Sequence, residues 1–153
     1  MLKETLIYER LRKTKLLFDS VAWIESFTPQ IKIIILDWIR NDQLTDEGVD
    51  MDGDIIGEYS KATEIISGGE KLEGDHFTLN DSGSFYRSMF IRVLQDSIIV
   101  DGDTAKMETS FSQKNGLWWR DEILGLTDEN LQKLVIEIKK KYIEYARKVL
   151  AID

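Results

Sequence analysis

Hydrophobic residues recur at steps of three and four in the first part of the chain, and this pattern predicts helices. One run extends from Leu2 to about Phe27, and a second from Gln30 to Asn41. A break is expected between them at Thr28-Pro29. Pro29 would then lie in the first turn of the second helix, where proline is tolerated. In the second run, a short strand at Ile33–Leu36 is the alternative, because β-branched residues dominate there.

The pattern over residues 127–150 predicts a long C-terminal helix. Thr127 is a suitable N-cap, and Asp128 and Glu129 place negative charge in the first turn, where the helix dipole favours it. Apolar residues then repeat over about six turns, which corresponds to a helix ~35 Å long.

Between these helical regions the periodicity first weakens and then changes to alternation. Seven of the ten glycines lie in residues 42–84, so a loop-rich excursion is expected there, with at most a short strand at Ile55–Tyr59. Alternating runs then predict three antiparallel strands, with a type I′ turn at Asp101-Gly102. The strands are Met89–Leu94, Ser97–Val100 and Thr104–Phe111, with the first turn at Gln95-Asp96.

Together these elements predict an α+β fold in one domain spanning residues 1–153. Its parts are an N-terminal helical region (1–41), an acidic loop excursion (42–84), a β meander with an aromatic loop (85–126) and a C-terminal helix (127–150). We expect a small antiparallel sheet of three to four strands, with the long C-terminal helix packed on it. The expected core consists of Ile7, Leu11, Phe18, Ile91, Val93, Ile98, Leu131, Leu134, Val135, Ile138 and Tyr142.

Acidic charge is concentrated in one segment. The chain has 28 acidic and 20 basic residues, a net charge of −8, yet residues 42–81 alone hold twelve acidic residues against Lys61 and Lys71. Such a segment repels phosphate, which argues against a nucleic-acid role for it. A solvated loop face explains the run, and docking onto a basic partner is the functional alternative. The first helix carries a basic cluster that includes Arg10, Arg12 and Lys13.

Several kinds of chemistry lack the residues they need. The chain has no cysteine, which excludes disulfides, thiolate zinc sites and a cysteine nucleophile. His76 is the only histidine, and neither a paired zinc set nor a Gly-x-Ser-x-Gly elbow accompanies it, so a surface or hydrogen-bonded histidine is expected. No phosphate-binding glycine loop, signal peptide or apolar run of ~20 residues is present. We therefore predict no catalytic, cofactor or metal site, and no enzyme.

Two short clusters are candidates for an interface. Asp50, Asp52 and Asp54 do not fit the register of an EF-hand, so an acidic Asp-Gly turn is the simpler interpretation and a non-EF cation site the alternative. Trp118 and Trp119 have the composition of an interface hot spot, and packing of both rings against the C-terminal helix is an equal alternative.

Three stretches, in chain order, carry a resemblance to a known family. They are Gly53–Ser60 with Thr63, Thr78–Ser88, and Ile123–Thr127 leading into the terminal helix. The first is similar to a G…lG-x-Y-S…T stretch and the second to an L-x-D-T-G-x-(L/F)-x-x-S element, with Ser82 in place of the usual Thr. In this order they resemble small phage virion-morphogenesis proteins of the head–tail connector and tail-completion (neck) group. The long excursion and the two tryptophans depart from that family.

The resemblance implies a structural virion protein, present in the host cytoplasm during assembly, that joins head to tail or completes the tail. It would form a ring of identical copies and meet other neck, portal or tail proteins, with no cofactor, no membrane and no sequence-specific nucleic acid. A ring needs complementary surfaces on different sides of each copy, and the basic first helix and the acidic segment are candidates. The hypothesis also places the terminal helix on the sheet.

Two other functions remain open at this point. One is a small acidic binding module, of the immunity or anti-defence type, that masks a basic partner surface. The other is a hydrolase with a carboxylate–metal site around Asp50–Asp54.

Overall fold

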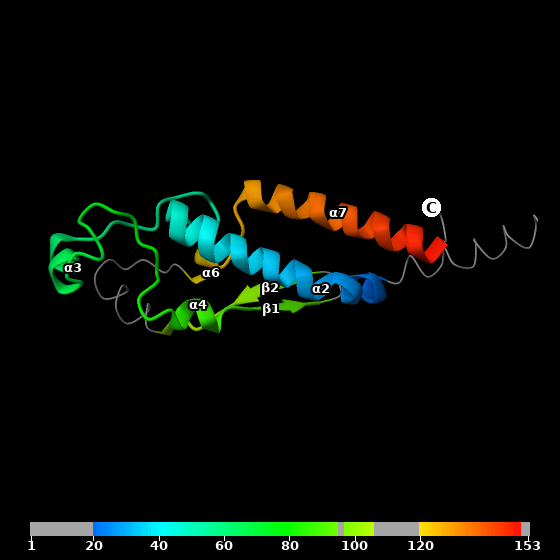
Figure 1. Cartoon of the computed structure of the whole chain (residues 1–153), viewed down its shortest axis with the longest axis horizontal. Coiled ribbons are helices and arrows are strands. Elements are labelled where there is room, and N and C mark those ends of the chain that lie inside the picture. The colour runs from blue at the N-terminus through cyan, green and yellow to red at the C-terminus, as the bar shows by residue number, and fades with distance from the viewer. Residues whose placement is uncertain (1–19, 95–96, 106–119, 151–153) are drawn as a thin grey trace, which may run out of the picture.

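The computed structural model describes residues 20–94, 97–105 and 120–150. Two long helices run beside a short β hairpin in an elongated molecule (Figure 1). The fold is therefore mixed helix and sheet, as the sequence predicts. Its elements are α2 (Ser20–Asp37), η1 (Trp38–Glu47), α3 (Lys61–Ile66), α4 (Ser84–Ser88), β1 (Phe90–Val93), β2 (Ile98–Asp101), α6 (Arg120–Ile123) and α7 (Asp128–Leu150).

α2 is continuous through its proline. Pro29 lies inside the helix, so the expected break is wrong, and Ile33–Leu36 is helical rather than extended. Ile31, Ile35 and Ile39 follow one another at steps of four and are all buried. Burial contributes roughly 1.5–3 kcal/mol for each such side chain, which together exceeds the ~3 kcal/mol cost of an internal proline.

α2 passes directly into η1, a wider π-type helix that ends at Gly48. The N–H of Gly48 donates to the carbonyl oxygen of Gln43, and Gly48 adopts the left-handed conformation with φ 65°. A Cβ at this position would also collide with the side chain of His76. The N-terminal helical region therefore continues to Glu47 before the excursion begins.

The rest of the excursion is stabilised by isolated β-bridges and by a short helix. The expected strand at Ile55–Tyr59 is replaced by isolated antiparallel bridges, which join Val49 to Ile55 and Glu58 to His76. α3 was not predicted. It begins where the hydroxyl of Ser60 accepts the N–H of Thr63 at 3.3 Å, the usual arrangement of a serine N-cap.

The first two predicted strands pair as expected. β1 and β2 are antiparallel, with Ile91 opposite Val100 and Val93 opposite Ile98. Among the described residues the sheet has two strands, so the predicted three to four are not confirmed. Thr104 and Ala105 are not part of a strand, while the rest of the third predicted strand and the Gln95-Asp96 turn lie outside the described residues.

The type I′ turn predicted at Asp101-Gly102 is wrong. A type I′ turn needs a positive φ at both central residues, and neither residue has one. Instead, a side-chain oxygen of Asp101 accepts the N–H of Gly102 at 2.8 Å. A hydrogen bond between the Asp101 side chain and the next backbone N–H thus takes the place of the type I′ turn predicted for this Asp-Gly pair.

α7 is confirmed as a long helix, but it packs on α2 rather than on the sheet. The hydroxyl of Thr127 accepts the N–H of Asn130 at 3.3 Å, which confirms the predicted N-cap. α7 contacts α2, and α2 contacts β1, so α2 runs between α7 and the hairpin in Figure 1. A long helix offers α7 a longer apolar stripe than a hairpin with four-residue strands does.

The core gathers around α2. Of the predicted core, Ile91 and Leu134 are buried, and Val93 and Ile138 pack against them. The predictions for three other residues are wrong: Ile98, Leu131 and Val135 are 40%, 48% and 42% exposed. On α7 the buried face is rotated about the helix axis relative to the predicted one, because Leu131 and Val135 lie beside the stripe that meets α2. Tyr142 is half-buried, and Ile7, Leu11 and Phe18 lie outside the described residues.

Candidate functional site

A buried amide fixes the start of the acidic segment to the start of α7. Gln43 of η1 is 0% exposed. Its Nε2 donates to the carbonyl oxygen of Gly125 at 3.0 Å, and its Oε1 accepts from the N–H of Thr127 and the Nδ2 of Asn130, each at 3.1 Å. Sequence reasoning missed this residue, although it lies four positions after Ile39 on the buried stripe.

Asp50, Asp52 and Asp54 form a tight loop beside α6. One side-chain oxygen of Asp50 accepts the N–H groups of Asp52 and Asp54, both at 3.0 Å. The N–H of Met51 donates to the carbonyl oxygen of Glu122 at 2.7 Å and anchors the loop. The acidic Asp-Gly turn predicted here describes this geometry. Across the part of the chain that the structure describes, no three His, Cys, Asp or Glu side chains group as potential metal ligands.

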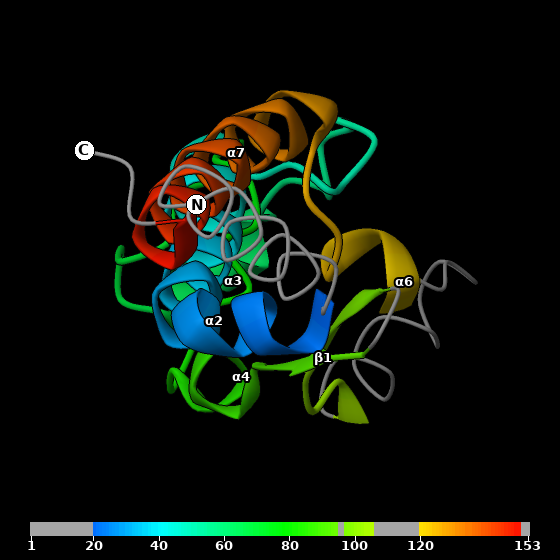
Figure 2. The same cartoon turned by 90° about the vertical axis from the view of Figure 1, so that its right-hand side faces the viewer.

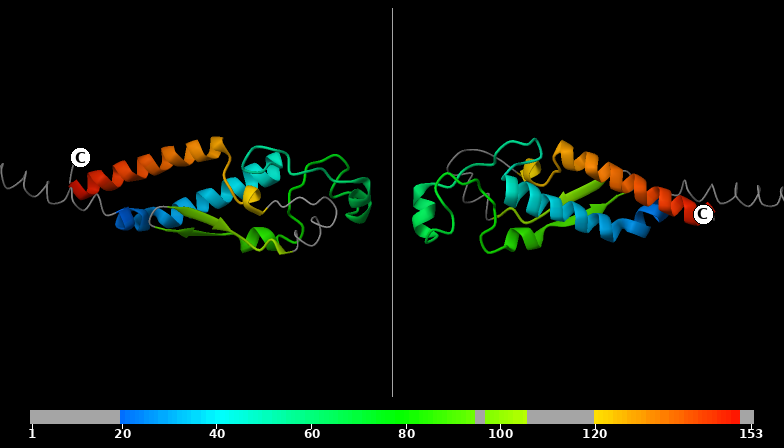
Figure 3. Two further views of the ribbon diagram at one scale, coloured as in Figure 1. Left: turned by 180° about the vertical axis from the view of Figure 1, so that it is seen from behind. Right: turned by 45° about the horizontal axis from the view of Figure 1, so that its top comes forward.

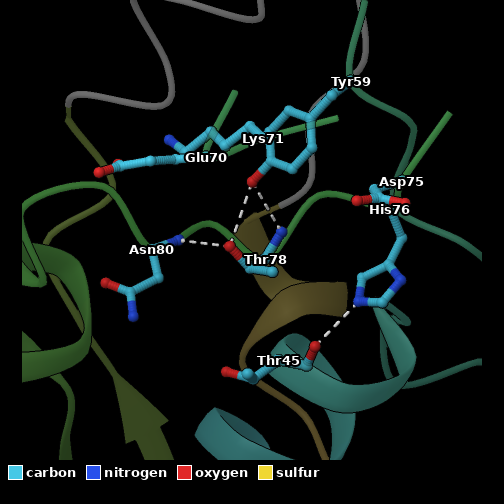
Figure 4. Close-up of a pocket in the computed structure, with 8 residues that line it drawn as sticks. All are labelled: Thr45, Tyr59, Glu70, Lys71, Asp75, His76, Thr78 and Asn80. Carbon is cyan, nitrogen blue, oxygen red and sulfur yellow. Dashed lines mark hydrogen bonds between the residues drawn. The ribbon is translucent and has the colours of Figure 1, made fainter. Parts of the chain in front are cut away.

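A polar cavity of about 500 Å³ opens on the excursion (Figure 4). The Tyr59 hydroxyl lies 3.1 Å from the Thr78 hydroxyl and accepts the N–H of Thr78, also at 3.1 Å. His76 is hydrogen-bonded, as predicted, with Nε2 2.9 Å from the carbonyl oxygen of Thr45. The cavity is lined by Thr45, Tyr59, Glu70, Lys71, Asp75, His76, Thr78 and Asn80.

Several polar groups of this cavity are paired with protein atoms. The Lys71 ammonium lies 5.5 Å from the centre of the Tyr59 ring and 3.7 Å from a carboxylate oxygen of Asp81. His76 contacts a backbone carbonyl, and among the described residues no hydroxyl is hydrogen-bonded to its ring. This contact joins the excursion to η1.

Tyr86 extends the same chain of hydrogen bonds to α4. Its hydroxyl donates to the carbonyl oxygen of Thr78 at 2.5 Å and lies 3.1 Å from the hydroxyl of Thr45. Burial raises the pKa of the Tyr86 phenol, and the hydrogen bond with Thr45 offsets part of that effect. The excursion is thereby attached to both η1 and α4.

The far end of the excursion exposes large apolar side chains. We call residues 58–75 the α3 end, and α3 marks one extremity of the long axis in Figure 1. Ile65 and Ile66 are 71% and 86% exposed there, and Leu72 is exposed as well. Sequence reasoning missed these residues, although an Ile-Ile pair inside an acidic, glycine-rich segment was the available signal.

The α3 end also carries acidic groups. Lys61 lies 2.6 Å from a carboxylate oxygen of Glu64, and this hydrogen bond lowers the pKa of Glu64 together with the N–H of Glu73. Glu58, Glu70 and Asp75 form no ion pair with the described residues. The α3 end therefore combines exposed apolar surface with carboxylates that have no ion-pair partner in the described part of the chain.

The opposite extremity is basic. The last turns of α7 lie at the other end of the long axis, nearest the viewer in Figure 2. This part of α7 carries Lys139, Lys140, Lys141, Arg147 and Lys148. Among the described residues, the α3 end and the last turns of α7 thus carry opposite net charge.

The structure places only part of the predicted interface. Asp50, Asp52 and Asp54 lie in one loop, whereas Arg10, Arg12, Lys13, Trp118 and Trp119 lie outside the described residues. None of the described helices has the length and apolar character needed to cross a membrane. No family model, no curated protein and no solved structure matches this chain.

Proposed function

We propose that this protein is a ring-forming structural component of a phage neck, which joins head to tail or completes the tail, and that it is not an enzyme. The observation that carries the proposal is the backbone at the residues of the family resemblance. Leu79 and Gly83 have positive φ values of 53° and 71°. Positive φ is uncommon for a residue with a side chain, such as Leu79, and at Gly57, which has φ 150°, an added Cβ would lie 2.6 Å from the ring of Phe77. The resemblance therefore involves positions with strict conformational demands.

Further residues of the three stretches also have local structural roles. Ser60 caps α3, Phe85 is buried in α4 and Ile123 is buried in α6. The hydroxyl of Ser88 donates to the carbonyl oxygen of Phe85 at 2.6 Å and accepts the N–H of Asp103 at 2.8 Å. The stretches that carry the resemblance therefore supply turns, a cap and buried residues of this fold.

The two unlike ends support assembly into a ring. Contacts between different surfaces of identical copies close into a ring when the rotation per subunit permits it. The packing of the C-terminal helix on a sheet, which the hypothesis also required, is replaced by packing on α2. The proposal therefore rests on the constrained turn residues and on the opposite charges of the two ends.

Light scattering across ionic strength tests the proposal. We expect the full-length chain to form closed oligomers whose population falls as salt rises, because salt screens contacts between exposed charges. Closed rings would also be visible by negative-stain microscopy. A monomer at every ionic strength, even with portal or tail proteins added, would contradict a ring-forming neck protein.

The acidic binding module remains a second candidate, favoured by the unpaired carboxylates of Glu58, Glu70 and Asp75 among the described residues. Capture of partners from the lysate of a producing cell separates the two functions. Portal, capsid or tail proteins support the neck protein, whereas a basic nuclease or toxin supports the binding module.

A further inference from the structure

The outer face of α7 has no partner among the described residues. Ile136 and Ile143 are 53% and 51% exposed, seven positions apart and therefore on the same side of the helix. They lie opposite the buried stripe that contains Leu134. Lys140 and Arg147, four positions after each isoleucine, share this outer face.

The charge of this face is available for a partner. Lys140 pairs with Glu137 at 2.6 Å, but Lys139 and Arg147 form no ion pair with the described residues. The face therefore presents two isoleucines flanked by positive charge. The α3 end presents the complementary combination, the exposed side chains of Ile65 and Ile66 on a segment whose Glu58, Glu70 and Asp75 form no ion pair with the described residues.

These two surfaces cannot meet within one chain, because they lie toward opposite ends of the long axis (Figures 1 and 3). We propose that the α3 end of one copy docks onto the outer face of α7 of a second copy, with Ile65 and Ile66 against Ile136 and Ile143. Lys139 and Arg147 would then face the carboxylates of Glu58, Glu70 and Asp75. This contact is head-to-tail, and it rests on the self-assembly proposed above by assigning the surfaces involved.

Two single substitutions test the contact by sedimentation velocity on the full chain. Ile66→Asp changes the α3 end and Ile143→Asp changes the α7 face, and both side chains are exposed, so folding is checked by circular dichroism. We expect each variant to weaken self-association at least tenfold. Ile33→Asp, at a 69% exposed isoleucine of α2, is the matched control and is expected to associate like the wild type.

Mixing the two defective variants provides a sharper test. Ile66→Asp keeps an intact α7 face, and Ile143→Asp keeps an intact α3 end, so one productive contact remains. We expect the mixture to form dimers, while each variant alone stays monomeric.

The outcomes separate this contact from the proposed function. Wild-type rings with both variants assembling normally would overturn the contact and leave the neck proposal standing. Variants that lose assembly without dimers in the mixture would overturn the head-to-tail geometry. A wild type that is monomeric in all conditions, including with portal or tail proteins, would overturn both proposals.

Discussion

The side-chain amide of Asn130 donates a hydrogen bond to the side-chain oxygen of Gln43, 87 positions earlier in the chain, at 3.1 Å. Both residues are buried, and Gln43 also bonds to the backbone of Gly125 and Thr127. One amide therefore joins η1, at the start of the acidic segment, to the first turn of α7. Buried polar groups are costly when unpaired, which makes this network a sensitive point of the fold.

Replacing Gln43 by alanine removes the acceptor and donor that this network needs. We expect Gln43→Ala to lower the free energy of unfolding by about 3 kcal/mol, because Asn130 and the backbone of residues 125 and 127 lose partners in a buried site. Urea denaturation followed by circular dichroism measures the change. Gln132→Ala, at an exposed position of α7, is the control and should leave stability nearly unchanged. Equal stability of the two variants would show that the network contributes little.

Gly48 is constrained by backbone conformation and by His76. Gly53 has a similar positive φ of 83°, but nothing lies within 4 Å of the position that a Cβ would occupy, so Gly53→Ala should cost only about 1–2 kcal/mol. Gly48→Ala should cost clearly more, because its methyl group would collide with His76. In thermal unfolding experiments, adding His76→Ala to Gly48→Ala should recover part of the excess, because it removes the His76 ring but leaves the His76 Cβ at 2.5 Å from the added methyl group. Equal losses for the two glycines would contradict this explanation.

The Glu64 carboxylate makes the stability of the α3 end depend on pH in the acidic range. Its pKa lies below the usual 4.5, chiefly because Lys61 donates a hydrogen bond to it and also because the N–H of Glu73 does. A carboxyl whose pKa is lower in the folded than in the unfolded state stabilises the fold at pH values above its unfolded-state pKa. This stabilisation is lost as the pH falls through the folded-state pKa. We expect NMR titration to place the pKa of the Glu64 carboxyl below 4.5 and Lys61→Met to raise it. A Glu64 pKa that Lys61→Met leaves unchanged would exclude Lys61 as its cause.

The phenol of Tyr86 makes the stability of the fold depend on pH in the alkaline range. Burial raises its pKa above the usual 10.0, so the folded state holds this proton more tightly than the unfolded chain does. The resulting stabilisation is present below pH 10 and is lost as pH rises through the folded pKa. Absorbance titration near 295 nm should show a late ionisation that disappears in Tyr86→Phe. Tyr145→Phe is the control, and loss of the late phase there instead would contradict the assignment.

Local signals were sufficient where an element is defined by neighbours in sequence. Thr127 caps α7 as predicted, because a hydroxyl reaching the N–H three residues later needs no distant partner. The pairing of β1 with β2 was predictable for the same reason, since short strands close in sequence pair readily. α3 was missed because a helix of six residues gives too short a hydrophobic pattern to detect.

The candidate surfaces were only partly predictable. The concentration of carboxylates in residues 42–81 was evident from composition, and the Asp50 turn follows from adjacent residues. The exposure of Ile66 and Ile143 was not, because an apolar residue is expected inside unless the fold leaves nothing to cover it. Their positions toward opposite ends of the molecule emerge only when both surrounding segments are placed in space.

The sequence by itself determined that the chain combines helices with an antiparallel hairpin, where α7 begins, and where acidic charge accumulates. Each of these depends on spacing, capping or composition within a short segment. Tertiary structure alone decided that α7 lies on α2, that Leu131 and Val135 remain exposed, and that Gln43 is buried. The physical reason is that periodicity specifies which side chains share a face, whereas the element that covers that face is selected by packing between segments far apart in the chain.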